Sequence, residues 1–192
     1  LRNFYILAVK YSQYKTIKLY SCVDKNGKEI PWYTYPAIEY LCNLDFSSKN
    51  IFEFGSGYSS LFWARRAKSV ISIEHDEKWY KKIKANCIKN QQILLRKANN
   101  EYEETIIEQK IKYDVIIIDG IRRPQCSKII KDQLNFESTD GCMVILDNSD
   151  WYIEVAKYLR EHLDMIEVDF HGFGPINDYT WTTSVFLSRN YR

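Results

Sequence analysis

The feature that most constrains the fold is a regular alternation, from about residue 51 onward, of short β-branched runs with longer amphipathic stretches. Strand-length apolar runs separated by helix-length segments indicate βαβ units and a parallel sheet. The continuous apolar runs at 115–118 and 143–146 are typical of central strands buried on both faces. The predicted strands are 50–54, 69–74, 92–97, 113–119, 142–147, 165–170 and 182–188, and the helices between them are 59–67, 77–90, 102–110, 125–134 and 151–163.

The end of this pattern differs from its beginning. The last two predicted strands are joined by 171–179, which contains two glycines and one proline and is too short to hold a helix. We therefore expect an antiparallel pair at the end of an otherwise parallel, doubly wound α/β sheet with helices on both faces. Residues 1–192 are predicted to form a single domain, in which 1–48 is an N-terminal helical extension (helices near 4–20 and 35–44) and 49–192 is the core.

Composition removes several classes of protein. The net charge of +2 gives no basic footprint for nucleic acid. The cysteines are odd in number, widely spaced and without a CxxC pair, so we expect reduced thiols in a cytoplasmic protein rather than a zinc site or a disulfide framework. The first residues lack a signal-peptide pattern and also an initiator Met, which leaves an earlier leader open. No apolar run approaches the ~20 residues of a membrane-spanning helix, so no membrane partner is expected.

The strongest local signal is the glycine turn EFGSGYSS at 53–60, which follows a predicted strand and precedes a predicted helix. Gly55 can adopt a backbone conformation closed to other residues, and Gly57 lets a ligand approach the main chain. Ser60 stands where a dinucleotide site usually has its third glycine. Glu53 would repel a pyrophosphate but could hold an ammonium group through a water, and Glu74 ends the next strand, where it could accept hydrogen bonds from ribose hydroxyls.

This pattern, E-x-G-x-G-x-S followed by I-E-H-D at the next strand, resembles the class I S-adenosylmethionine-dependent methyltransferases over about residues 30–188. The resemblance implies a Rossmann-like fold, a seven-stranded sheet with strand order 3-2-1-4-5-7-6, and S-adenosylmethionine as the cofactor. It also implies that the turn holds the methionine end, that Glu74 holds the ribose, and that His75 and Asn99 border the adenine. The cofactor-binding residues expected on this basis are Glu53, Gly55, Ser56, Gly57, Ser59, Glu74, His75, Asn99 and Asp119.

Polar residues also follow the two central strands. Asp119 ends one of them, and Asp147 and Asn148 end the other. Neighbouring strands lie ~4.8 Å apart, so these oxygens should converge into a partial shell of the type that binds Mg²⁺. The alternative is that they cap the helices that follow. The D…DN arrangement resembles the metal-binding set of the catechol-type O-methyltransferases, but Arg122 stands where that family has its general base.

Arginine stays protonated, so Arg122 is expected to stabilise an alkoxide or to clamp an anionic substrate. A looser resemblance, to bacterial methyltransferases of surface-glycan pathways, implies that Asp119 acts on a sugar hydroxyl without a metal. His171, in the join between the last strands, is a further candidate base, although a structural loop histidine is the simpler interpretation.

Together these observations predict methyl transfer from S-adenosylmethionine to an oxygen of a small molecule or a sugar, with Mg²⁺ as an optional cofactor. Aromatic residues at 32–35 and 179–181 are candidates for an acceptor pocket or for ordinary packing. Two alternatives remain open at this point, namely a non-catalytic binding protein of the same fold and an NAD-dependent oxidoreductase. A homodimer is also left open.

Overall fold

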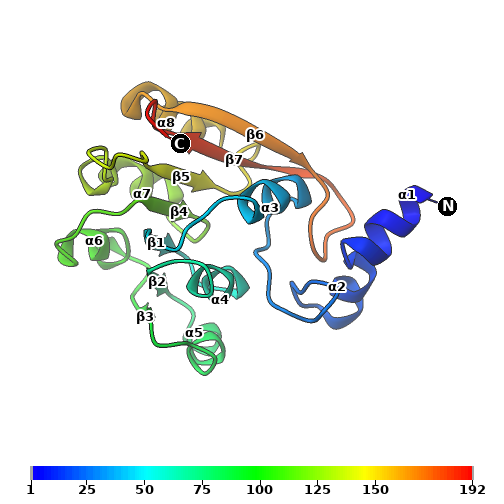
Figure 1. Cartoon of the computed structure of the whole chain (residues 1–192). Coiled ribbons are helices and arrows are strands. Elements are labelled where there is room, and N and C mark those ends of the chain that lie inside the picture. Colours follow the sequence, from blue (N-terminus) through cyan, green and yellow to red (C-terminus); the bar gives the residue numbers. More distant parts are fainter. Residues whose placement is uncertain (1, 192) are drawn as a thin grey trace.

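The fold is centred on a seven-stranded sheet in the computed structural model, which describes residues 2–191 (Figure 1). The strand order is β3-β2-β1-β4-β5-β7-β6, as predicted. Neighbours from β3 to β5 pair in parallel, and β7 pairs antiparallel with both β5 and β6. The strands are β1 (Asn50–Phe54), β2 (Ser69–Glu74), β3 (Gln91–Leu95), β4 (Val115–Ile118), β5 (Met143–Leu146), β6 (Ile166–Gly172) and β7 (Trp181–Leu187).

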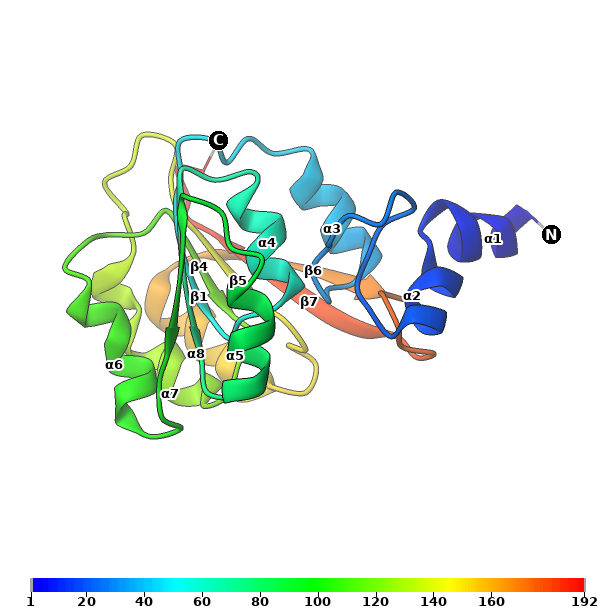
Figure 2. The same ribbon diagram turned by 90° about the horizontal axis from the view of Figure 1, so that it is seen from below.

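Helices cover both faces of the sheet (Figure 2). On one face lie α6 (Asn100–Glu108), α7 (Arg123–Ile129) and α8 (Ile153–Leu163), and on the other lie α3 (Tyr35–Cys42), α4 (Tyr58–Ala64) and α5 (Glu77–Lys84). Each layer encloses its own apolar core, and the central strands β4 and β5 are buried along their whole length. Continuous apolar strands thus produce a sheet covered on both sides, which is what the sequence pattern predicts.

The predicted N-terminal extension has two different parts. Residues of α3, including Ile38 and Leu41, are buried against the sheet, so this helix belongs to the packed body. The preceding helices α1 (Arg2–Tyr5), a π-helical segment (Ile6–Lys10) and α2 (Gln13–Leu19) project beyond the edge of the sheet (Figures 1 and 2). They carry exposed apolar side chains, among them Phe4 and Tyr14.

Several helices are shorter than predicted, and two of them differ most from the prediction. The helix predicted at 77–90 ends at Lys84, and Asn90, just before β3, instead donates side-chain hydrogen bonds to the carbonyls of Ala64 and Ala67. The helix predicted at 125–134 is instead α7 followed by a short 3₁₀ segment, Lys131–Gln133. Pro124 lies in the first turn of α7, where its missing N–H has no intrahelical partner to lose. Within residues 2–191, no helix combines the length and the apolar character needed to cross a membrane.

Candidate active site

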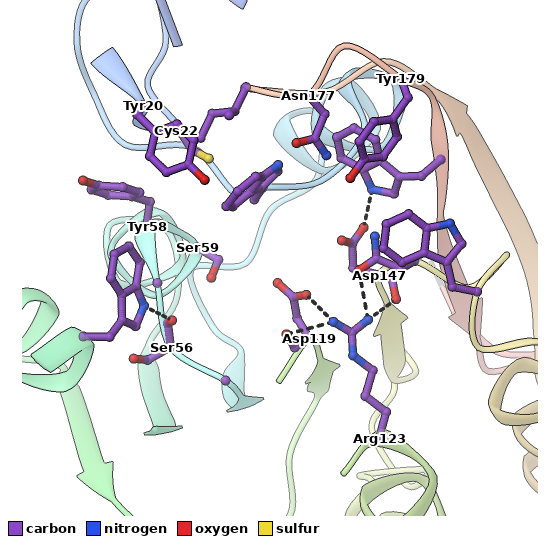
Figure 3. A pocket seen from close by; sticks show the side chains of 18 of the residues that line it. Tyr20, Cys22, Ser56, Tyr58, Ser59, Asp119, Arg123, Asp147, Asn177 and Tyr179 are labelled. Carbon is purple, nitrogen blue, oxygen red and sulfur yellow. Dashed lines mark hydrogen bonds and ion pairs between the residues drawn. The ribbon is translucent and has the colours of Figure 1, made fainter. Parts of the chain in front are cut away.

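A cavity of about 470 Å³ opens beyond the carboxyl ends of β1, β4 and β5 (Figure 3). This is the place where open α/β sheets bind ligands, and the volume is that of an ordinary small-molecule site. A second cavity of about 580 Å³ adjoins it at the end of β2 and shares part of its lining. The residues common to both cavities are Gly55, Ser56, Trp79, Lys82 and Asp119.

The two glycines of the turn serve different purposes. Gly55 has φ +96°, and a Cβ there would lie 2.8 Å from the backbone of Gly120, so only glycine fits. Gly57 is extended, and the nearest atom to a Cβ there would be Ser59 Oγ at 3.6 Å. The packing of the chain itself therefore does not require glycine at 57. Gly57 lines the first cavity, which fits the predicted approach of a ligand to this part of the main chain.

Glu53 lies behind the turn rather than in the cavity. Its side chain is fully buried and accepts hydrogen bonds from Ser59 (2.5 Å), Ser60 and Ser72 (2.6 Å). Burial raises the pKa of Glu53 to about 7, and the three hydroxyl groups oppose that rise. Of these residues only Ser59 lines the cavity, so the Ser59 hydroxyl lies between the Glu53 carboxylate and the cavity. Ser60 also accepts a hydrogen bond from the Gly57 N–H at 3.0 Å, which gives the serine a structural reason to replace the third glycine.

Glu74 lines the second cavity and holds the turn in place. Its Oε2 accepts hydrogen bonds from the backbone N–H and the hydroxyl of Ser56 at 3.1 and 3.0 Å. Its Oε1 accepts from the N–H groups of His75 and Asp76. His75 lines the same cavity, with Nδ1 3.0 Å from Glu74. Asn99 lines neither cavity, and its side chain caps α6 by accepting a hydrogen bond from the Glu101 N–H.

The two carboxylates at the ends of β4 and β5 converge on the first cavity, as predicted. Burial raises the pKa of Asp119 to about 6, opposed by the neighbouring Arg123 guanidinium. Burial and the charge of Asp119 raise the pKa of Asp147 well above its usual range. Asp147 Oδ1 accepts hydrogen bonds from the indole of Trp181 (3.1 Å) and from Thr183 (2.5 Å). A pair of this kind, with shifted pKa values in a cavity, is a typical functional-site signature.

The arginine that joins these strand ends is Arg123, not Arg122. Arg123 is buried, and its guanidinium donates to Asp119 Oδ1 at 3.1 Å and to Asn148 Oδ1 at 3.2 Å (Figure 3). Arg122 has φ +54° and begins the turn into α7, and its side chain pairs with Glu103 at 2.7 Å. It lines neither cavity. The predicted active-site role of Arg122 therefore has to be corrected, since the turn directs the neighbouring arginine to the strand ends.

His171 is likewise away from the cavity. It lies on β6, within the antiparallel pair rather than in the join after it. Its Nδ1 is 2.9 Å from Thr182 Oγ1 and its Nε2 is 3.1 Å from Thr180 Oγ1. The side chain lines neither cavity, so the structure does not support the prediction that it is a base.

The residues predicted to hold Mg²⁺ do not fit a metal ion. Asp119 and Asn148 each give an oxygen to Arg123, and Asp147 Oδ1 already accepts two hydrogen bonds. The cationic guanidinium, about 3 Å from two of the three expected ligands, would repel a divalent ion. Across residues 2–191 there is no group of three or more His, Cys, Asp or Glu side chains arranged to hold a metal. No step of the chemistry is therefore assigned to magnesium.

Aromatic side chains from separate parts of the chain form the outer wall of the cavity. Trp151 and Tyr179 lie with ring centroids 6.0 Å apart, and Tyr179 lies 6.0 Å from Trp181. Tyr20 and Trp32 come from the N-terminal segment, with ring centroids 6.5 Å apart. The aromatic residues that line the cavity are Tyr20, Trp32, Tyr58, Trp79, Trp151, Tyr179 and Trp181.

Solved structures with the same architecture allow the fold to be assigned. An O-methyltransferase of tomaymycin synthesis from Streptomyces achromogenes, in complex with SAM, matches with a TM-score of 0.56 and 16% identity over 73% of each chain. An rRNA methylase from Streptococcus thermophilus matches with a TM-score of 0.54 and 14% identity over 79% of this chain and 95% of that one. A methyltransferase from Pyrococcus furiosus matches with a TM-score of 0.53 and 18% identity over 80% of this chain and 83% of that one. The chain has the Rossmann-like methyltransferase fold.

The methyltransferase fold is shared at low identity, and the relatives act on different acceptors. One is named for ribosomal RNA and another for the synthesis of a small molecule, so the likeness shows the fold and leaves the acceptor open. No protein-family model and no curated protein matches the sequence. The function of this chain has to be inferred from the site itself.

Several residues of the site were not predicted from the sequence. Arg123 lies four residues after Asp119, a spacing that could have indicated their pairing. Trp79 donates from its indole to the Ser56 carbonyl at 2.6 Å and so fixes the turn. Lys82, which reads as part of a solvated charged face, lies over the Trp79 ring at 4.5 Å and lines both cavities. No sequence signal identifies Trp151 as part of the aromatic wall, because its contact with Tyr179 depends on the tertiary fold.

Proposed function

We propose that this protein is an S-adenosylmethionine-dependent O-methyltransferase that acts, without a metal ion, on a hydroxyl group of a small molecule or a carbohydrate. The observation that carries the proposal is that a single cavity joins the glycine turn, on one side, to the carboxylates of Asp119 and Asp147 and an aromatic wall on the other. The turn supplies a binding surface for the cofactor, and the carboxylates and aromatic rings supply one for an acceptor.

The residues around the turn suit a cofactor with a cationic end and a ribose. Gly57 leaves its stretch of main chain open, and the nearby acid Glu53 disfavours a pyrophosphate. This argues against NAD, whose phosphates need donor-rich surroundings. Glu74 Oε2 can accept a hydrogen bond from a ribose hydroxyl in place of the one that it now accepts from the Ser56 hydroxyl at 3.0 Å. When bound, S-adenosylmethionine would supply a methyl group activated by its attachment to a sulfonium.

Asp119 is the group best placed to act as a base. Its Oδ1 is held by Arg123, and no described residue donates to its Oδ2. The acceptor oxygen forms its bond to the methyl carbon as the carbon–sulfur bond breaks, and the acceptor proton passes to Asp119 Oδ2. The products are a methylated acceptor and a neutral thioether. Burial raises the pKa of Asp119, which makes its carboxylate a stronger base toward the acceptor proton.

The aromatic wall supports a carbohydrate or another small ring as the acceptor. Trp151 and Tyr179 are 59% and 45% exposed, so their faces are open to a ligand. Aromatic faces pack well against the apolar faces of sugar rings, while carboxylates such as Asp119 and Asp147 bind hydroxyl groups. The near-neutral net charge gives no support to a long polyanion such as RNA.

Calorimetric titration with S-adenosylhomocysteine tests the cofactor assignment, with NAD as the control ligand. We expect micromolar binding of S-adenosylhomocysteine and none of NAD, and the reverse result would show that the turn is a dinucleotide site.

Acceptors are then screened with methyl-labelled cofactor, starting from sugars and phenols. Asp119→Asn should reduce methyl transfer by about 100-fold or more while leaving S-adenosylhomocysteine affinity within a few-fold. Unchanged methylation by Asp119→Asn would remove Asp119 from the mechanism, and a chain that binds the cofactor but methylates nothing in the screen would support the non-catalytic alternative.

A further inference from the structure

Arg123 is the most completely bonded side chain at the end of the sheet. Its Nε donates to the Gly120 carbonyl at 2.9 Å. Its Nη1 donates to the Asp147 carbonyl and to Asn148 Oδ1, and its Nη2 donates to the carbonyl and to Oδ1 of Asp119. These five hydrogen bonds equal the number of N–H donors that a guanidinium carries. No donor is left for a substrate.

The same group connects two neighbouring strands. Asp119 and Gly120 follow β4, while Asp147 and Asn148 follow β5, and Arg123 bonds to all four residues. One face of the guanidinium is covered by the ring of Tyr152, with 4.5 Å between the guanidinium carbon and the ring centroid. The planar group is therefore fixed in both position and orientation.

The charge at this point also has to be balanced. Asp119 and Asp147 are close enough for the charge of Asp119 to raise the pKa of Asp147. Two such carboxylates in a cavity need a nearby cation, since an uncompensated buried charge is strongly destabilising. Arg123 is that cation, and its side chain is only 9% exposed.

We infer that Arg123 is a positioning residue that takes the place of a divalent metal ion, so that this centre holds its carboxylates with a built-in cation and works without a metal. The guanidinium orients Asp119 through Oδ1 and leaves Oδ2 for the acceptor. The catalytic consequence rests on the proposed function, whereas the occupation of the cation position does not.

Binding of Mn²⁺ alone, followed by the relaxation of water protons, tests the inference without an acceptor. Wild type and Arg123→Lys keep a cation at this position and should show no Asp119-dependent Mn²⁺ binding. Arg123→Ala vacates the position beside three oxygen-bearing side chains, and should bind Mn²⁺ at least about tenfold more tightly than wild type. Adding Asp119→Asn to Arg123→Ala should remove that gain.

Arg66→Ala is the matched control, because Arg66 also donates to backbone carbonyls, those of Leu41, Cys42 and Leu44, but does not line either cavity. Arg66→Ala should lower the melting temperature without creating a Mn²⁺ site. Thermal unfolding of every variant shows which of them are folded. If Arg123→Ala does not fold, wild type and Arg123→Lys still decide the question.

A Mn²⁺ site in wild type that Asp119→Asn abolishes would overturn the inference, and so would a folded Arg123→Ala that gains no Mn²⁺ binding. With an acceptor in hand, wild-type methylation should be unaffected by EDTA, and Arg123→Lys should retain more activity than Arg123→Ala. Loss of wild-type activity in EDTA, restored by Mg²⁺, would also contradict it. Failure of wild type to bind S-adenosylhomocysteine would instead contradict the proposed function, so the two failures are distinguishable.

Discussion

Gly55 and Gly120 lie back to back at the carboxyl ends of β1 and β4, so that a Cβ on Gly55 would lie 2.8 Å from the Gly120 Cα and N. The glycine turn is therefore held against the strand that carries Asp119. This contact fixes the distance between the cofactor side and the carboxylate side of the cavity.

The two glycines of the turn should respond differently to the same substitution. Gly55→Ala places a methyl group against backbone at φ +96°, and we expect a loss of at least about 2 kcal/mol in the free energy of unfolding. Gly57→Ala meets no atom closer than 3.6 Å and should change stability by less than about 1 kcal/mol, while weakening S-adenosylhomocysteine binding by about tenfold or more. Denaturant unfolding and calorimetry measure the two effects. Unchanged affinity in Gly57→Ala would show that the ligand does not approach this residue.

Burial of Glu53 should make stability depend on pH. Its pKa is raised to about 7 in the folded protein, above that of the unfolded chain, so the folded state binds the proton more tightly. The contribution to stability is therefore fully present at pH values below the unfolded pKa and is lost as the pH rises to about 7, with a total of up to about 3 kcal/mol. Glu53→Gln cannot titrate, so its stability relative to wild type should rise over this range. A difference between the two proteins that does not change with pH would contradict the assignment.

The pairing of Arg122 with Glu103 predicts a structural role for Arg122. Glu103 is buried, and the hydrogen bond from Arg122 lowers its pKa. Arg122→Met should cost about 1 kcal/mol near neutral pH. This cost should shrink as the pH falls through the acidic range, because a carboxylate with a lowered pKa loses its advantage when it is protonated. Methyl transfer should stay within about twofold of wild type. A loss as large as that of Arg123→Ala would restore the sequence-based prediction for Arg122.

The aromatic wall should affect the acceptor and not the cofactor. Trp151→Ala removes a half-exposed ring that faces Tyr179, and the KM for the acceptor should rise by about tenfold. Affinity for S-adenosylhomocysteine should stay within about twofold. Ile153→Ala is a matched control, since Ile153 is 64% exposed and does not line the cavity that contains Trp151 and Tyr179. Equal effects of the two substitutions on the KM would show that the wall does not bind the acceptor.

Much of the fold could be predicted because its signals are local. Continuous apolar runs located β4 and β5, and the short join at 171–179 predicted the antiparallel pair. The convergence of Asp119 and Asp147 followed from their positions at neighbouring strand ends. These features depend on periodicity and topology, which sequence patterns express directly.

The details that failed depend on backbone geometry that a pattern does not contain. Neighbouring arginines cannot be told apart by type, and the left-handed φ of +54° at Arg122 decides which of them reaches the strand ends. The predicted magnesium set depends on such geometry too, because the sequence shows three oxygen donors but not the Arg123 guanidinium that binds two of them. His171 was expected in a loop, whereas β6 continues through it and its ring nitrogens lie beside threonines.

The cavity is divided between two kinds of chain segment. The surface beside the glycine turn comes from one continuous stretch, 55–82, whereas the aromatic wall is assembled from loops as distant as Trp32, Trp151 and Tyr179. Substitutions, insertions or deletions in those loops can reshape the wall without disturbing the turn. Under the proposed function, a lineage of such proteins can therefore exchange one acceptor for another while inheriting the same methyl donor, so that acceptor preference can diverge faster than the chemistry.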